Sequence, residues 1–197
     1  MRRSGVVCVP MISLLLSACG TGDGTIGLQE QVLAIRSNYL EHTGCTAQLR
    51  VSADYGQRVY AYTVNVTATQ EETALVVEQP QELAGLAVRM GGAQGQLEYN
   101  GAILETGTLD VQGLTPLSAV PILLEHARSG FIDSCTVETL GERETLRVLC
   151  SDPEQAAGQG REITLWFDAQ THALVRGELA VDGIRVILCE FLEFSLL

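Results

Sequence analysis

The sequence predicts an α+β fold: a curled, incompletely closed antiparallel β-barrel of about ten strands, with two or three helices across its concave face. Apolar residues near the N-terminus recur with the period of a helix, whereas those of most later segments alternate with the period of a strand. Short turns separate the alternating segments. Strands joined in order by short turns form a meander, and a sheet of this size must curl, which leaves a concave side for helices to cover.

The first predicted element is a helix over residues 28–42. Gly44 follows the helix and is a suitable stop. The helix has one apolar stripe, which consists of Leu28, Val32, Ile35 and Tyr39.

Strands with one wet face follow, because apolar and polar residues alternate. The first alternating segments are 47–54, 60–68, 73–78 and 84–90. A hairpin comes next, since Asn100-Gly101 is the preferred dipeptide of a type I′ turn, with Tyr99 facing Ala102 and Leu97 facing Leu104.

A second helix is predicted within residues 113–130. Pro121 does not fit the middle of one helix, so the helix either starts near Ser118 or kinks at the proline. The remaining strands are a hairpin over 135–150 and the segments 161–168, 173–181 and 184–194, with a tight turn at Asp182-Gly183.

The N-terminus has the pattern of an export signal. Arg2 and Arg3 precede an apolar stretch over residues 6–16, which is too short to span a bilayer as a helix. The stretch ends in Leu16-Ser17-Ala18-Cys19, which resembles the lipobox of bacterial lipoproteins at all four positions. We therefore expect a signal peptide at 1–18, a lipid-modified Cys19 with a flexible tether over 19–27, and a folded domain over 28–197.

The charge of the chain argues against nucleic acid as a partner. The formal net charge is −12, there is no lysine, and the arginines are scattered. The same charge disfavours electrostatic docking on anionic lipid, so the membrane is expected as a partner only through the lipid anchor.

Four cysteines remain for the folded domain, and an even number outside the cytoplasm permits disulfides. In the hairpin 135–150, a four-residue turn over 141–144 would place Cys135 opposite Cys150. Cys45 and Cys189 are then the remaining pair. The four show no metal-ligand spacing, so no metal site and no cofactor are expected.

The sequence favours a non-catalytic protein. His42 lies near Cys45, but it closes a helix, and His126 lies on a helix face. His172 follows Asp168, which together with Thr171 is expected to cap backbone groups of a turn. No nucleophile elbow and no phosphate-binding loop occurs.

Three segments carry a family resemblance: "LWFDAQTHALVRGEL" (165–179), "YNGAILETG" followed by "GLTPLSAVPILLEHARSG" (113–130), and "CEFLEF" near the C-terminus. Over residues 28–197 the chain resembles the bacterial LolA/LolB superfamily, whose members are open, curled antiparallel barrels with helices across the mouth. It departs from the family pattern at Ala173, where a proline is usual near this point. The second segment resembles a Gram-positive branch, the GerS-like germination and sporulation lipoproteins, and this implies a cell-wall amidase as partner.

Two functions remain open. In the first, an extracytoplasmic lipoprotein docks a protein partner at the membrane, through a sheet edge or an apolar helix face. In the second, the curled sheet carries or receives lipoproteins or another hydrophobic ligand. The candidate lining for such a ligand is Leu49, Val51, Tyr60, Tyr62, Val64, Leu97, Trp166 and Phe167.

Overall fold

A computed structural model describes residues 23–91, 94–107 and 114–197. The predicted signal peptide and Cys19 lie outside these residues. The elements follow the chain as α1 (Asp23–Glu41), β1 (Gly44–Asp54), β2 (Val59–Thr69), β3 (Thr73–Gln79), a 3-10 turn η1 (Gln81–Leu83), β4 (Ala87–Gly91), β5 (Gln94–Tyr99), β6 (Ala102–Gly107), α2 (Ala119–Ser129), β7 (Ile132–Leu140), β8 (Arg143–Cys150), β9 (Arg161–Asp168), β10 (Leu174–Val181) and β11 (Ile184–Leu196).

The eleven strands form one antiparallel sheet in the order β6-β5-β4-β3-β2-β1-β11-β10-β9-β8-β7. The N-terminal strand β1 and the C-terminal strand β11 pair at the centre, so the two ends of the domain are joined there. The outermost strands are β6 and β7, and no described strand pairs them with each other. The predicted curled, open sheet with two helices is confirmed.

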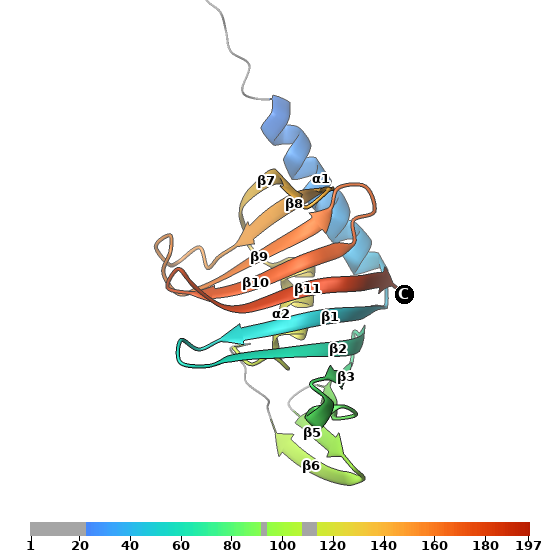
Figure 1. Cartoon of the computed structure of the whole chain (residues 1–197). Coiled ribbons are helices and arrows are strands. Elements are labelled where there is room, and N and C mark those ends of the chain that lie inside the picture. The colour runs from blue at the N-terminus through green and yellow to red at the C-terminus, as the bar shows by residue number, and fades with distance from the viewer. Residues whose placement is uncertain (1–22, 92–93, 108–113) are drawn as a thin grey trace, which may run out of the picture.

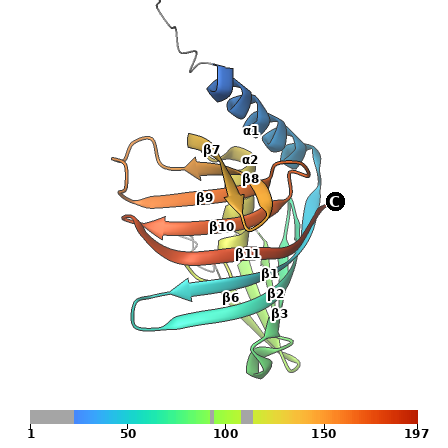
Figure 2. The same ribbon diagram turned by 45° about the horizontal axis from the view of Figure 1, so that its top comes forward.

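Both helices lie on one side of the sheet, where Figures 1 and 2 show α2 behind the central strands and α1 running past β7 and β8. The inner faces of the strands and the buried residues of the helices form the core. Val32, Ile35 and Tyr39 of the predicted apolar stripe are buried on α1. Among the described residues, neither helix has the length and hydrophobicity needed to cross a bilayer.

The helix boundaries follow local sequence. Helix α2 has Ser118 as its N-cap, which confirms the first of the two alternatives for residues 113–130. Pro121 therefore falls in the first turn, where its missing N–H costs little. Helix α1 begins at Asp23 rather than at 28, so residues 23–27 of the predicted flexible tether are helical, which corrects that prediction.

Two tight turns have the predicted geometry. Asn100 and Gly101 have φ of 52° and 78°, and the pairs Tyr99/Ala102 and Leu97/Leu104 face each other as expected. Asp182-Gly183 has φ of 51° and 75°, and also forms a two-residue turn. Positive φ at both positions is the type I′ conformation that suits the twist of a hairpin.

The predicted register of the β7–β8 hairpin is wrong. Leu140 pairs with Arg143, so the turn has two residues rather than four. Gly141, at φ 64°, provides the positive φ that this shorter turn needs at its first position. Cys135 consequently lies opposite Val148, whereas Cys150 lies opposite Ile132.

All four described cysteines are free thiols, which corrects both predicted disulfides. Cys45 and Cys189 are far apart because Cys45 pairs with Leu196 on β11, whereas Cys189 pairs with Val51. Cys45 and Val51 are six positions apart on β1, a distance of about 20 Å along a strand. A disulfide requires Cα atoms closer than about 7 Å.

Candidate functional site

The concave face of the sheet is the site that the sequence predicts, and α2 occupies it. Ala119, Val120, Leu123, Leu124 and Ala127 of α2 are buried against the sheet. The closest approach is at Gly177 on β10, where an added Cβ would lie 2.5 Å from Cδ1 of Leu123. Because β10 has no side chain at this point, the helix sits directly on the sheet.

The central residues of the predicted lining are packed in the core. Leu49 and Val51 are 0% exposed, and Val64 is 1% exposed. A side chain with no accessible surface touches no space that holds a water molecule. These three residues therefore contact other side chains and line no open cavity. Phe167 is also buried, with its ring edge-on to Tyr39 of α1 at a centroid distance of 5.5 Å.

The other members of the predicted lining lie towards the rim. Tyr60 is 38% exposed and packs near Tyr55 beside the β1–β2 turn, with ring centroids 6.0 Å apart. Tyr62 and Leu97 are half-buried and pack against the core from its margin. Tyr60 and Tyr62 lie on β2, where Tyr62 pairs with Val51, and Leu97 lies on β5. Leu49 and Val51 have no accessible surface, so they share no pocket with these three residues.

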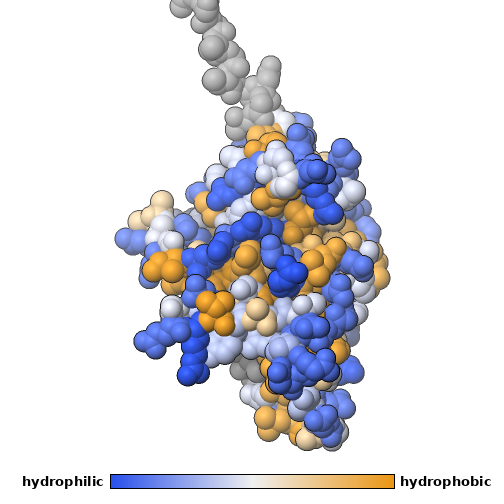
Figure 3. All heavy atoms as spheres, viewed as in Figure 1, coloured by the Kyte–Doolittle hydropathy of each residue, from blue (hydrophilic) through white to orange (hydrophobic). Residues whose placement is uncertain are grey.

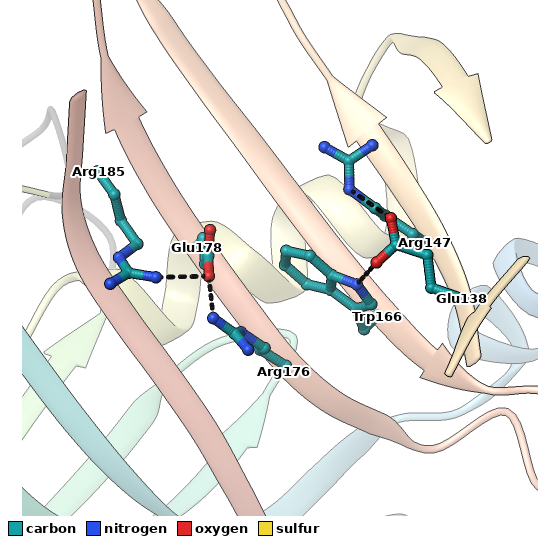
Figure 4. A network of polar contacts seen from close by, with 6 residues as sticks. All are labelled: Glu138, Arg147, Trp166, Arg176, Glu178 and Arg185. Atoms are coloured by element: carbon teal, nitrogen blue, oxygen red, sulfur yellow. Dashed lines mark hydrogen bonds and ion pairs between the residues drawn. The ribbon is translucent and has the colours of Figure 1, made fainter. Parts of the chain in front are cut away.

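Trp166 lies on the opposite face of the sheet from the core, which corrects its place in the predicted lining. Its indole N–H donates to Oε2 of Glu138 at 2.9 Å, and the guanidinium groups of Arg147 and Arg176 lie 5.7 Å and 5.1 Å from its ring centroid. Figure 4 shows these side chains on the face turned away from α2. Cations at this distance from an indole ring are stabilised by the ring quadrupole.

A second ion pair cluster continues the first across the same face. Glu178 on β10 accepts from Arg176 and from Arg185 of β11, the latter at 3.1 Å. Together the two clusters connect β7, β8, β9, β10 and β11 (Figure 4). The charges of the two arginines beside Trp166 are therefore balanced by glutamates. The polar contacts on this face hold together the strands of the C-terminal half of the sheet.

The two helices are fastened to each other and to the sheet by polar contacts. Arg36 of α1 donates to the carbonyl oxygen of Gly130, and Nε of Arg128 donates to the carbonyl oxygen of Tyr39 at 3.3 Å. The Tyr39 hydroxyl donates to the carbonyl oxygen of His172 at 3.1 Å. Burial raises the pKa of the Tyr39 hydroxyl well above its usual range, so it remains a donor.

Among the described histidines and cysteines, no hydrogen bond joins an imidazole to a thiol. Nδ1 of His42 lies 2.7 Å from the carbonyl oxygen of Asn38, and Nδ1 of His126 lies 2.9 Å from that of Ile122. Burial raises the pKa of the Cys45 and Cys150 thiols to about 11, so both are protonated at neutral pH and are poor nucleophiles.

Asp168 has the turn-capping role that the sequence predicts. Its Oδ1 accepts from the backbone N–H groups of Gln170 and Thr171 at 3.0 Å and 2.8 Å. The N–H of Thr171, followed by that of Gln170, lowers the pKa of the Asp168 carboxyl. Among the described residues, no group of three or more His, Cys, Asp or Glu side chains could hold a metal ion.

A polar groove of about 680 Å³ lies beyond the C-terminal end of α2. It is lined by His126, Cys150 and Arg161, together with residues of the β8–β9 loop and of the turn at Asp182. Burial lowers the pKa of His126, which is therefore neutral at pH 7. The sequence carries no signal for this groove, because its residues come from four separate segments.

The exposed outer strand β6 is a feature that could not be predicted from the sequence. All its residues except Thr106 are exposed, and Ile103 and Leu104 are 61% and 62% exposed. Hydrophobic side chains gather at this end of the molecule in Figure 3. The Asn100-Gly101 turn predicts the hairpin, but no local pattern shows which strand of a sheet is outermost.

Comparison with known proteins shows similarity in structure alone. No protein-family model matches the chain, and no curated protein sequence is a significant match. An uncharacterised conserved protein from Thermus thermophilus superposes with a TM-score of 0.50 at 10% identity, over 86% of this chain and 87% of that one.

Two lipoproteins are among the other similar structures. The Mycobacterium tuberculosis lipoprotein LppX has a TM-score of 0.48 at 15% identity, over 88% of this chain and 96% of that one. A chain of the complex between the CwlD amidase and the GerS lipoprotein of Clostridioides difficile has a TM-score of 0.44 at 13% identity, over 85% and 94%. At these identities the comparisons show a shared fold alone, and the superposition on the Thermus protein supports the open, curled antiparallel sheet.

Proposed function

We propose that the protein is a membrane-anchored extracytoplasmic lipoprotein that acts as a non-catalytic docking module for an envelope protein. The observation that carries the proposal is the packing of the concave face. Leu49 and Val51 have no accessible surface, and Leu123 of α2 sits on Gly177. The interior is thus already filled by the protein's own side chains, while exposed aliphatic side chains remain at a sheet edge.

The proposed anchor is the lipid-modified Cys19. Only three residues separate Cys19 from Asp23, where α1 begins. A chain extends by at most about 3.6 Å per residue, so the start of α1 would lie within about 14 Å of the modified cysteine. Such a short connection would hold the domain close to the membrane, where a docking module needs to be.

The proposed anchor predicts the cellular fraction in which the Cys19→Ala variant is found. In Cys19→Ala cells the protein should move from the membrane fraction to the soluble extracytoplasmic fraction, because no acyl chains can be attached. Its thermal unfolding should be unchanged, since Cys19 precedes the first described helix. Fractionation followed by immunoblotting measures the first result, and retention of the variant in the membrane fraction would contradict the proposal.

The partner that we propose first is a cell-wall amidase of spore germination. This choice comes from the resemblance of residues 113–130 and of "YNGAILETG" to the germination branch. Crosslinking in intact cells, followed by mass spectrometry of the crosslinked peptides, tests it. A reproducible crosslink to an amidase supports the proposal, and crosslinks to acyl chains alone would favour the carrier function.

The alternative is a carrier or receptor for lipoproteins or other hydrophobic ligands. The half-buried Tyr62 and Leu97 at the margin of the core favour it, because they could join a cavity. Such a cavity would require α2 to leave the sheet and the contacts of Arg36 and Arg128 to break.

A further inference from the structure

The outer edge of β6 is open for strand pairing. In the described part of the chain β6 pairs with β5 alone, and its other side has no strand neighbour. Alternate residues of an antiparallel edge strand direct their N–H and C=O groups away from the paired neighbour, and these groups can pair with a further strand. Figure 1 shows β6 at the end of the sheet, away from both helices.

The side chains of β6 do not protect this edge. Ile103 and Leu104 are consecutive, so they point to opposite faces of the strand, and both are more than half exposed. Soluble proteins usually protect such an edge with charge, proline or a covering element. The opposite edge, β7, is less open, because α1 lies against it and it carries Asp133 and Glu138.

The charges near β6 define what can pair with it. The β5–β6 hairpin carries Glu98 and Glu105 and no basic residue. Arg89 of β4 lines the same groove as Glu105, and its guanidinium is paired with Glu72 at 3.4 Å. Glu82 of η1 is also near, since the Tyr99 hydroxyl donates to its carbonyl oxygen at 2.7 Å. A second copy of this acidic chain would bring the same carboxylates to the edge, and like charges that face each other across strands are destabilising.

We propose that the outer edge of β6 binds an extended segment of the docked envelope protein, in which apolar residues alternate with basic ones. The segment adds a twelfth strand to the eleven of the sheet. Its backbone pairs with β6 and its apolar side chains cover Leu104 on one face of the sheet. Its basic side chains lie on the other face near Glu98 and Glu105, and their alkyl stems cover Ile103. This inference rests on the proposed docking function and identifies the docking surface.

A synthetic peptide tests the pairing on the full-length protein in detergent. The probe alternates valine with lysine and threonine, and it should slow amide hydrogen exchange over residues 102–107. The same peptide with glutamate in place of lysine should bind at least about tenfold more weakly, by charge repulsion at the acidic hairpin. A peptide that is N-methylated on alternate amides, on the side facing β6, should give no protection. Equal protection by all three peptides, or none by the first, would overturn the proposal.

Two matched variants test the site. Ile103→Lys should weaken binding of the basic peptide about fivefold or more, because it removes an apolar contact and repels lysine. Ile184→Lys changes a residue that is 70% exposed at the β10–β11 turn, and should leave binding unchanged. Both positions are exposed, so both variants should fold. Equal weakening by the two variants would show that β6 is not the site.

Crosslinking in cells distinguishes failure of this inference from failure of the docking function. A photoreactive residue placed at 103, 104 or 105 of the full-length chain should crosslink to successive residues of one extended partner segment. If partner crosslinks arise only from elsewhere on the chain, docking stands and the β6 site is wrong. Crosslinks between two copies of β6 would also refute the inference, in favour of a homodimer.

Discussion

Two glycines show how the same substitution has opposite effects in different surroundings. Gly44 opens β1, and an added Cβ would overlap the backbone carbonyl oxygen of Ala68 on β2. We expect Gly44→Ala to lower the free energy of unfolding by about 1–3 kcal/mol, because the paired strands must move apart. Gly27 lies in α1 with nothing within 4 Å of the added Cβ. Gly27→Ala should raise the free energy of unfolding by about 0.5–1 kcal/mol, as in an exposed helix. Urea unfolding measures both, and the same sign for the two variants would contradict the explanation.

The face of the sheet on which Trp166 lies could be predicted from the sequence, whereas the side chains that it contacts could not. Trp166 and Phe167 are neighbours on one strand, so they must point to opposite faces, and both cannot line one cavity. In "REITLWFD" the alternation of Ile163 and Leu165 already assigns Phe167 to the core. The contacts with Glu138 and Arg176 depend on which strands are adjacent, and no local pattern contains that information.

At the scale of elements, the packing of α2 against the sheet distinguishes the docking function from the carrier function. Gly177→Ala should lower the free energy of unfolding by about 1–3 kcal/mol, because the new methyl group collides with Leu123. Leu123→Ala should cost about 2–5 kcal/mol by leaving a cavity. The double variant should cost less than the sum, since the methyl group then enters that cavity. Chemical unfolding of the four proteins measures this coupling, and strictly additive losses would show that α2 does not rest on β10.

Elements with a local signature were predicted well, and those that depend on turn length were not. Asn100-Gly101 and Asp182-Gly183 each need positive φ at two successive residues, and this requirement is visible in the sequence. The turn after Leu140 allowed both a two-residue and a four-residue form. The glycine at 141 suits the shorter form, and the resulting register separates Cys135 from Cys150.

At the scale of the whole molecule, the pairing of β1 with β11 gives the sheet its centre. Most of the strand order follows the chain, because consecutive alternating segments with short turns become neighbours. The pairing of the first strand with the last carries no local signal, since their partners are separated by most of the chain. This pairing makes β6 and β7 the edges, so the open edge at β6 could not be predicted either.

Because the interior is packed, we expect the purified protein to carry no bound lipid. The chain from residue 20 to 197, purified gently from a bacterial host, should have its bare mass in native mass spectrometry, even with phospholipid in excess. The reason is that Leu49, Val51 and Leu123 leave no accessible surface for an acyl chain to contact while α2 is seated. Gly177→Ala provides the matched control, because its methyl group would displace Leu123 and expose the concave face, and it should increase the number of lipid adducts. A stable lipid adduct on the unmodified protein would show that α2 opens readily, and would favour the carrier function over docking.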